Sequence, residues 1–253
     1  MAERPAAAHL GTRRLRPSVG VVIAVRNGAA LLPGAFESVI AQLRPDDRVV
    51  VMVGESSDDT ARVARALPSH RVAIDVVEQS GTGLAQARNQ AVAMIECDMV
   101  AFCDADDRWT SGSLDARTHA IGHDDISAVI GSVRTMSLDG LDVPAHRRDE
   151  MGTATPGFTP GALLARRELF EQVGGFDERL AIACDSDWFL RFHESGLQLG
   201  QLDEVVLVKG VRPDSLSTDI GRYRSELLEA ARRHTRRRSG AASSDSPDRT
   251  SRG

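Results

Sequence analysis

The sequence has little cysteine. Among its 253 residues there are three cysteines, Cys97, Cys103 and Cys184. They are widely spaced and odd in number, which excludes the paired spacing of a zinc site and that of a disulfide framework. This usage indicates a reducing compartment.

Long apolar runs are absent as well. No stretch approaches the roughly 20 consecutive apolar residues that span a bilayer. Arginines at positions 13, 14 and 16 interrupt the N-terminal region where a signal peptide would need an apolar core. We therefore expect a cytoplasmic protein without a transmembrane segment.

The chain also lacks an excess of positive charge. Its formal net charge of -5 argues against a broad nucleic-acid-binding face, and we expect no nucleic-acid partner. A local basic cluster lies near the C-terminus, at Arg232, Arg233, Arg236, Arg237 and Arg238. We interpret it as a solvated helix end, and a weak peripheral membrane contact is the alternative.

The chain contains enough apolar residues for one enzyme-sized hydrophobic core, because hydrophobic residues make up 42% of it. The two ends differ from the rest. Residues 1–17 show no sustained apolar period, and residues 239–253 have almost nothing to bury, so we predict a disordered tail at each end. A single domain is expected over residues 18–238.

The first half of that domain alternates strand-like apolar runs with helical spacing. Expected strands are Val19–Val25, Val49–Val53, Val72–Val77 and Met99–Cys103. Expected helices begin near Leu32, at a cap formed by Ser57 or Asp58, and after Gly83. This β-α-β repetition predicts an α/β fold with a mostly parallel sheet flanked by helices, whose ligands bind beyond the carboxyl ends of the strands.

The second half is less regular. We expect strands over Ala128–Val133 and Glu204–Lys209, and helices over Arg166–Val173 and Asp187–Glu194.

An acidic run, Asp104-Ala105-Asp106-Asp107, follows the expected strand Met99–Cys103 directly. Carboxylates this close repel one another in a partly dry cleft unless a cation lies among them. Mg²⁺ or Mn²⁺ prefers oxygen ligands and commonly binds one or two carboxylates together with substrate phosphates. We therefore predict a metal site with Asp106 as the first direct ligand; a surface turn with capping aspartates is the alternative.

Six segments in order resemble the inverting family-two glycosyltransferases, and the resemblance runs from Val19 to about Ser217. They are VGVVIAVRN, SSDDT, GLAQARNQA, AFCDADDRW, LLARRELFEQVGGFDERL and CDSDWFLRFHESG. The resemblance implies a GT-A fold, with a nucleotide-sugar half over residues 18–110, an acceptor half over 111–220 and a C-terminal helix over 221–238.

The same resemblance implies roles for the acidic residues. Asp104 and Asp106 would contact the nucleotide ribose and the metal-bound diphosphate, with Asp107 in support, and Asp185 would be the general base. Asp187 is the second candidate for the base. From the residues themselves, Trp188 beside this pair offers the partly desolvated setting that suits a carboxylate base, although either aspartate can instead cap the following helix.

Donor binding is expected from residues spread over the chain. Arg88 suits a diphosphate as a bidentate donor, or it is an exposed helix arginine. Backbone at Ala24 and Val25 is expected to line the base pocket, and Arg26 can stack on a nucleobase.

Several positions depart from the family pattern. Val53 and Gly54 stand where acidic residues usually hold the nucleoside, and the neighbouring Glu55 can substitute for them. Cys184 stands where a glutamate is common. Other departures are Ala91 for a glycine and Arg212 and Ser215 for a histidine and an asparagine; Arg212 can still bind the diphosphate by its charge.

The sequence thus predicts transfer of a sugar from a nucleotide-diphosphate sugar to an acceptor hydroxyl, with Mg²⁺ or Mn²⁺ as cofactor. The acceptor is left open among glycolipid, polysaccharide, natural product and peptide. A noncatalytic, glycosyltransferase-like binding or scaffold protein is the alternative. A nucleotidyltransferase would need a glycine-rich basic loop after the first strand, and the Gly81-Thr82-Gly83 match to a dehydrogenase motif lacks its third glycine.

Overall fold

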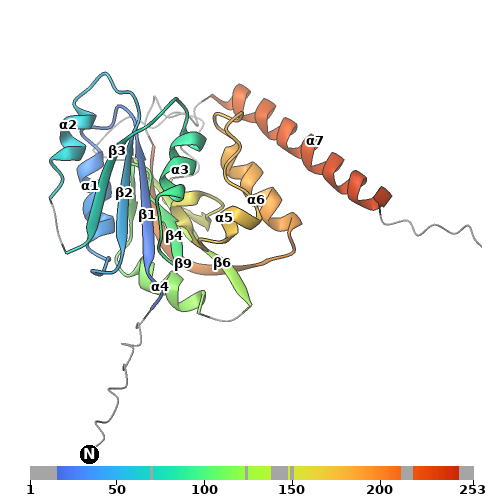
Figure 1. Cartoon of the computed structure of the whole chain (residues 1–253), viewed down its shortest axis with the longest axis horizontal. Coiled ribbons are helices and arrows are strands. Elements are labelled where there is room, and N and C mark those ends of the chain that lie inside the picture. The colour runs from blue at the N-terminus through green and yellow to red at the C-terminus, as the bar shows by residue number, and fades with distance from the viewer. Residues whose placement is uncertain are drawn as a thin grey trace, which may run out of the picture.

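A computed structural model describes residues 16–68, 71–122, 125–137, 148, 151–211 and 219–244 (Figure 1). The first half contains β1 (Val19–Val25), α1 (Leu32–Ile40), β2 (Arg48–Val53), α2 (Thr60–Arg65), β3 (Ala73–Glu78), α3 (Leu84–Ala93) and β4 (Met99–Phe102). The second half contains β5 (Asp107–Trp109), α4 (Ser113–Ala120), β6 (Ile126–Ser137), β7 (Ala154–Pro156), the short 3₁₀ helix η2 (Pro160–Ala162), β8 (Leu163–Arg166), α5 (Leu169–Gln172), α6 (Cys184–Glu194), β9 (Gln198–Val211) and α7 (Ile220–Ser244).

The described strands form one mixed sheet in the order β3-β2-β1-β4-β8-β6-β9-β5, with β7 paired to β6. The strands β3, β2, β1 and β4 are mutually parallel, as the alternation of strand and helix predicts. Antiparallel β8 continues the sheet beside β4, and β6 and β9 form a long parallel pair beyond it. The predicted α/β fold with a largely parallel central sheet is confirmed.

Helices cover both faces of this sheet, and each face has its own core. Apolar side chains of α1, α2 and α4 pack with alternate residues of β1 and β2 in one core. Those of α3, α5 and α6 pack with the intervening residues in the other. Every residue of β1 is therefore buried, which explains why its sequence is a continuous apolar run.

The helix α7 extends away from the rest of the fold (Figure 1). It begins beside α6, where the Glu226 carboxylate accepts hydrogen bonds from the backbone N–H groups of Ile182 and Ala183, at 2.8 and 3.0 Å. Further along α7, Arg233 pairs with Asp177 at 2.6 Å. These contacts hold the start of α6 in place.

Some predicted boundaries differ from the structure. Of the helix predicted over Arg166–Val173, only α5 is helical. Arg166 is instead the last residue of β8, which is buried between β4 and β6. A short continuous apolar run does not distinguish strand from helix. The helix predicted over Asp187–Glu194 begins at Cys184. Helix α7 runs to Ser244, beyond the predicted end at residue 238.

At the N-terminal side, Arg16 falls within the predicted tail. It is buried and makes two hydrogen bonds to the Asp47 carboxylate, at 3.0 and 2.5 Å. Among the described helices, none is both long and apolar enough to cross a bilayer. The cytoplasmic location stays a prediction.

Candidate active site

The candidate site forms where the carboxyl ends of the parallel strands meet the start of α6. The chain leaves β4 at Phe102 and passes through Cys103 to Asp104, while β1 ends beside it at Val25. Helix α3 begins at Leu84, directly after Gly83, whose positive φ of 105° favours glycine, and α3 carries Arg88 to this edge. Residues of β4, α3 and α6 therefore converge on one place, as expected for a parallel sheet.

Arg88 joins the two predicted acidic segments. Its Nη2 donates to both carboxylate oxygens of Asp104, at 2.8 and 3.0 Å, and its Nη1 donates to Asp185 Oδ1 at 2.6 Å. The Arg88 side chain is only 1% exposed, whereas about a fifth to a quarter of each carboxylate is exposed, at 21% and 24%. Arg88 is thus an internal clamp that presents both aspartates to solvent, and the exposed-helix interpretation is wrong.

The opposite charges of this clamp stabilise the ionised forms of Arg88 and Asp104. Burial alone would lower the pKa of Arg88, but Asp104 and Asp185 outweigh it and raise that pKa. Burial alone would raise the pKa of Asp104. The charges of Arg88 and Lys209 and the hydrogen bond from Arg88 outweigh burial, so the pKa of Asp104 lies below its ordinary value. Cys184 donates from Sγ to Asp185 Oδ1 at 3.4 Å, and burial raises the pKa of this thiol, which keeps it neutral. Asp104 is therefore held ionised.

Asp107 lies deeper than the other carboxylates of the run. Its Oδ1 accepts from Gly210 N at 3.0 Å, and its Oδ2 is buried without a hydrogen-bond partner among the described residues. Burial raises the pKa of Asp107 to about 7, with Lys209 opposing and Asp106 and Asp104 adding to the rise. Asp107 is 1% exposed and too enclosed to be the first ligand, and its supporting role stays a prediction.

Lys209 is a functional candidate that sequence reasoning missed. It pairs directly with Asp107 across the antiparallel strands β5 and β9, which places the two side chains on the same face of the sheet. The charges of Asp107, Asp104, Asp106 and Asp185 all raise the pKa of Lys209, with Asp107 the strongest. A permanent cation therefore lies among these carboxylates. No local pattern reveals this, because Asp107 and Lys209 meet only through the sheet register.

The residues fit a divalent cation that is shared with a substrate, but not one held by the protein alone. Asp106 is half-buried in the turn after β4, and its carboxylate oxygens and those of Asp104 are the hard donors that Mg²⁺ and Mn²⁺ prefer. No group of three or more His, Cys, Asp or Glu side chains suited to a metal occurs within the described residues. Phosphate oxygens and water would have to complete such a shell.

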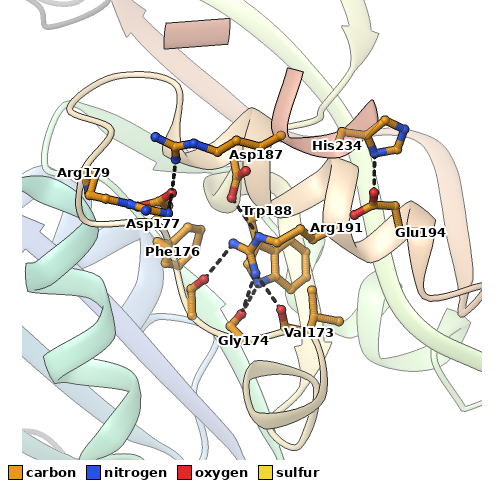
Figure 2. A network of polar contacts seen from close by, with 12 residues as sticks. Val173, Gly174, Phe176, Asp177, Arg179, Asp187, Trp188, Arg191, Glu194 and His234 are labelled. Carbon is orange, nitrogen blue, oxygen red and sulfur yellow. Dashed lines mark hydrogen bonds and ion pairs between the residues drawn. The ribbon is translucent and has the colours of Figure 1, made fainter. Parts of the chain in front are cut away.

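Asp187, the second candidate for the base, belongs to a different network (Figure 2). It is 2% exposed, and its Oδ2 accepts from Arg191 Nε at 2.7 Å. Arg191 also donates to the backbone carbonyls of Val173, Gly174 and Gly175. Asp187 therefore orients an arginine that closes the turn after α5, and it does not reach the Arg88 clamp.

The predicted nucleotide side lies at the ends of β1 and β2. Arg26 is exposed, and its Nε donates to the backbone carbonyl of Glu55 at 3.2 Å. The loops after the two strands are tied together through Asn27, which has a positive φ of 49° and accepts from Ser57 N at 2.8 Å. This brings Arg26 and Glu55 together on an accessible edge.

The other predicted donor contacts divide into two groups. Ala24 and Val25 are buried, and the Val25 carbonyl already accepts a hydrogen bond from Gly54 N at 2.8 Å. Their predicted backbone contact with the nucleobase stays a prediction. Arg212 and Ser215 lie outside the described residues.

Comparison with known sequences identifies the family. The profile described as "Glycosyl transferase family 2" matches residues 20–177. The succinoglycan biosynthesis protein ExoU of Rhizobium meliloti is 28% identical over 225 residues, which cover 79% of this chain and 64% of that protein. A PGL/p-HBAD biosynthesis glycosyltransferase of Mycobacterium bovis is 26% identical over 178 residues, 69% of each chain. This chain spans less than two thirds of ExoU.

Solved structures share the fold. S. aureus TarS in complex with UDP-GlcNAc gives a TM-score of 0.67 at 17% identity and covers 86% of this chain and 65% of its own. The mannosyltransferase PcManGT of Pyrobaculum calidifontis, in complex with GDP-Man and Mn²⁺, gives 0.66 at 24% identity, with 88% and 65% covered. The likeness confirms the predicted GT-A fold.

Proposed function

The chain belongs to glycosyl transferase family 2, and we propose that it transfers a hexosyl group from a nucleotide-diphosphate sugar to an acceptor hydroxyl with inversion. The observation that carries the proposal is the Arg88 clamp. It places Asp104, at the end of β4, beside Asp185, at the start of α6, with both carboxylates open to solvent. One carboxylate faces the donor side and the other is available to an acceptor.

In the proposed reaction Asp185 accepts the proton of the acceptor hydroxyl as that oxygen attacks the anomeric carbon. Arg88 fixes the orientation of Asp185 through its 2.6 Å hydrogen bond, and Cys184 binds the same carboxylate oxygen. The second oxygen of the Asp185 carboxylate is left to receive the proton. Asp187 is not assigned this step because its side chain is only 2% exposed, whereas that of Asp185 is 24% exposed.

Asp104 and Asp106 would hold the donor's ribose and diphosphate, the latter through Mg²⁺ or Mn²⁺. A divalent cation bound there supplies positive charge to the departing diphosphate, so that this group leaves without a proton. Lys209 adds a fixed positive charge to the same place. Arg26 and Glu55 would contact the nucleoside from the ends of β1 and β2.

Two similar structures support the class of donor. By their descriptions, TarS is in complex with UDP-GlcNAc and PcManGT with GDP-Man and Mn²⁺. These ligands belong to those proteins. For this chain they recommend uridine and guanosine diphosphate sugars as the first donors to test.

The test is a panel of UDP-, GDP- and dTDP-sugars with Mn²⁺, in which release of the nucleoside diphosphate is measured. At least one donor should turn over, and Asp106→Asn and Asp185→Asn should each reduce the rate by at least about 100-fold. Asp115→Asn is the matched control, because Asp115 is an exposed carboxylate on α4. Equal turnover by the Asp106 and Asp115 variants would overturn the proposed donor site.

A noncatalytic binding protein makes a different prediction. Such a protein would bind a nucleotide sugar in a titration, yet it would release no nucleoside diphosphate from any donor. Val53 and Gly54, where the family usually has acidic residues, motivate this alternative. The retained clamp between Asp104 and Asp185 argues against it, because binding a donor requires no carboxylate at the acceptor side.

A further inference from the structure

A second concavity lies beside the candidate active site, between α6, the start of β9 and α7. Its volume is about 680 Å³, within the range typical of small-molecule pockets. The apolar side chains that line it include Phe158, Phe189, Leu190, Leu197, Leu199 and Leu227. We call this concavity the α6 pocket. None of the predicted donor or metal residues within the described part of the chain lines it.

The α6 pocket and the candidate active site share the helix α6. Ser186 lines the pocket, and its chain neighbour is Asp185. Adjacent α-carbons are about 3.8 Å apart, and successive helix side chains point about 100° apart around the axis. Asp185 therefore faces Arg88 while Ser186 faces the pocket. The lining of the pocket thus includes the residue next to the proposed base.

The opposite wall leads to the same place. Phe158 precedes the 3₁₀ helix η2, and a β-carbon added to Gly161 of that helix would lie 3.4 Å from Asp107 Oδ2. One short segment thus runs from the pocket wall to the acidic run. The pocket wall at Phe158 is thus three residues from Gly161, which lies beside Asp107, and the wall at Ser186 is one residue from the proposed base Asp185.

The lining contains an aromatic pair that suits a flat apolar group. The rings of Phe158 and Phe189 pack edge to face, with centroids 5.6 Å apart at 84°. Phe158 is nevertheless 56% exposed, which leaves much of its ring open at the rim. Aromatic rings offer a further ring an edge-to-face or offset-stacked position. The polar end is marked by Ser186 Oγ, 3.2 Å from the Tyr223 hydroxyl.

We propose that the α6 pocket binds an aromatic aglycone of the acceptor, so that the acceptor is a hydroxylated compound carrying an apolar aromatic ring. This inference rests on the proposed function, which supplies the base beside Ser186. A purely sugar acceptor would leave the Phe and Leu side chains of the pocket without a partner. A simple alkyl chain would not use the ring geometry of Phe158 and Phe189.

The test measures binding without any donor, so its result does not depend on transferase activity. Phenyl, methyl and octyl glycosides of one hexose are titrated into the full chain by calorimetry, and saturation-transfer NMR identifies which protons contact the protein. The phenyl glycoside should bind at least about tenfold more tightly than the methyl glycoside, because only the former buries a ring. Its ring protons should receive the strongest saturation.

Variants then locate the binding. Phe158→Ala and Leu227→Gln should each weaken phenyl glycoside binding by about three- to tenfold. Leu228→Gln is the matched control, because Leu228 is the next residue of α7, is 59% exposed and does not line the pocket. Its binding should equal that of the unmodified chain. Circular dichroism checks that all three variants are folded.

Three outcomes would overturn the inference. Equal affinity for phenyl and methyl glycosides would show that the ring is not recognised. Tighter binding of the octyl glycoside than of the phenyl glycoside would assign the pocket to an alkyl chain. Equal effects of the Leu227 and Leu228 substitutions would place the ring elsewhere. Failure of the proposed function would show separately, as no nucleoside diphosphate release from any donor.

Discussion

Replacing Arg88 by lysine tests the arrangement on which the candidate active site depends. The substitution keeps the positive charge but removes the planar fork that binds Asp104 and Asp185 at once. One ammonium group cannot reproduce three hydrogen bonds to two carboxylates in the same directions. We expect the Asp185 carboxylate to lose its fixed orientation.

The magnitude follows from the burial of Arg88. Each hydrogen bond to a charged group contributes about 1.5–3 kcal/mol, and removing one partner of a buried ion pair costs about 3–5 kcal/mol. Arg88→Lys should therefore lower the free energy of unfolding by about 2 kcal/mol, and Arg88→Met by about 4 kcal/mol. A base displaced by about 1 Å loses on the order of 100-fold in rate, so kcat of Arg88→Lys should fall at least that far.

The assay combines urea denaturation with nucleoside diphosphate release on the best donor. Arg117→Lys is the matched control. Arg117 is a fully buried arginine that donates to the Leu163 carbonyl and stacks on Trp109, and burial lowers its pKa to about 9. The control should lose stability while keeping kcat. If Arg88→Lys keeps kcat within about threefold of the unmodified chain, the clamp does not position the base and the reasoning fails.

Other predictions concern residues around the clamp. Lys209→Met should raise the KM for the donor by about tenfold, because a cation beside the diphosphate is lost, and an unchanged KM in a donor titration would refute its role. Asp177→Asn should lower stability by about 1–2 kcal/mol at pH 7, after allowance for solvent screening. The Arg179 hydrogen bonds lower the pKa of Asp177 to about 2, so this contribution is present above pH 4 and vanishes as the pH falls through 2, where urea denaturation should find no difference. Asp187→Asn should lower the melting temperature yet retain most of kcat per folded molecule, in contrast to Asp185→Asn. If both variants lost kcat equally, Asp187 would again be a candidate for the base.

The sequence predicted the first half of the fold well because its signals are local. Strands such as Val19–Val25 are buried on both faces, so their composition alone identifies them. The second half contains β5, a strand of only three residues, and β8, of four. Segments this short carry no reliable period. The position of these strands in the sheet depends on which strands they pair with, and that pairing cannot be predicted from the local sequence.

The candidate site residues likewise differ in whether local sequence or long-range contacts reveal them. Asp104, Asp106 and Asp185 were recognised from short motifs, and the structure brings Asp104 and Asp185 to one arginine. Asp187 looked equivalent to Asp185 in sequence. Helical geometry separates them, because residues two apart in a helix point to different sides, and Arg191 is four residues from Asp187. Lys209 escaped notice because the contact that matters joins strands about a hundred residues apart.

The balance of charge at the clamp explains why donor and metal should bind together. Four carboxylates, Asp104, Asp106, Asp107 and Asp185, surround the two cations Arg88 and Lys209. Burial raises the pKa of Asp107 to about 7, and the charges of Asp106 and Asp104 add to this rise while Lys209 opposes it. A diphosphate entering alone would add negative charge to this excess, whereas a divalent cation entering alone would find too few ligands among the residues that the structure describes. Each ligand therefore supplies what the other lacks, and by linkage each must raise the affinity for the other by the same factor.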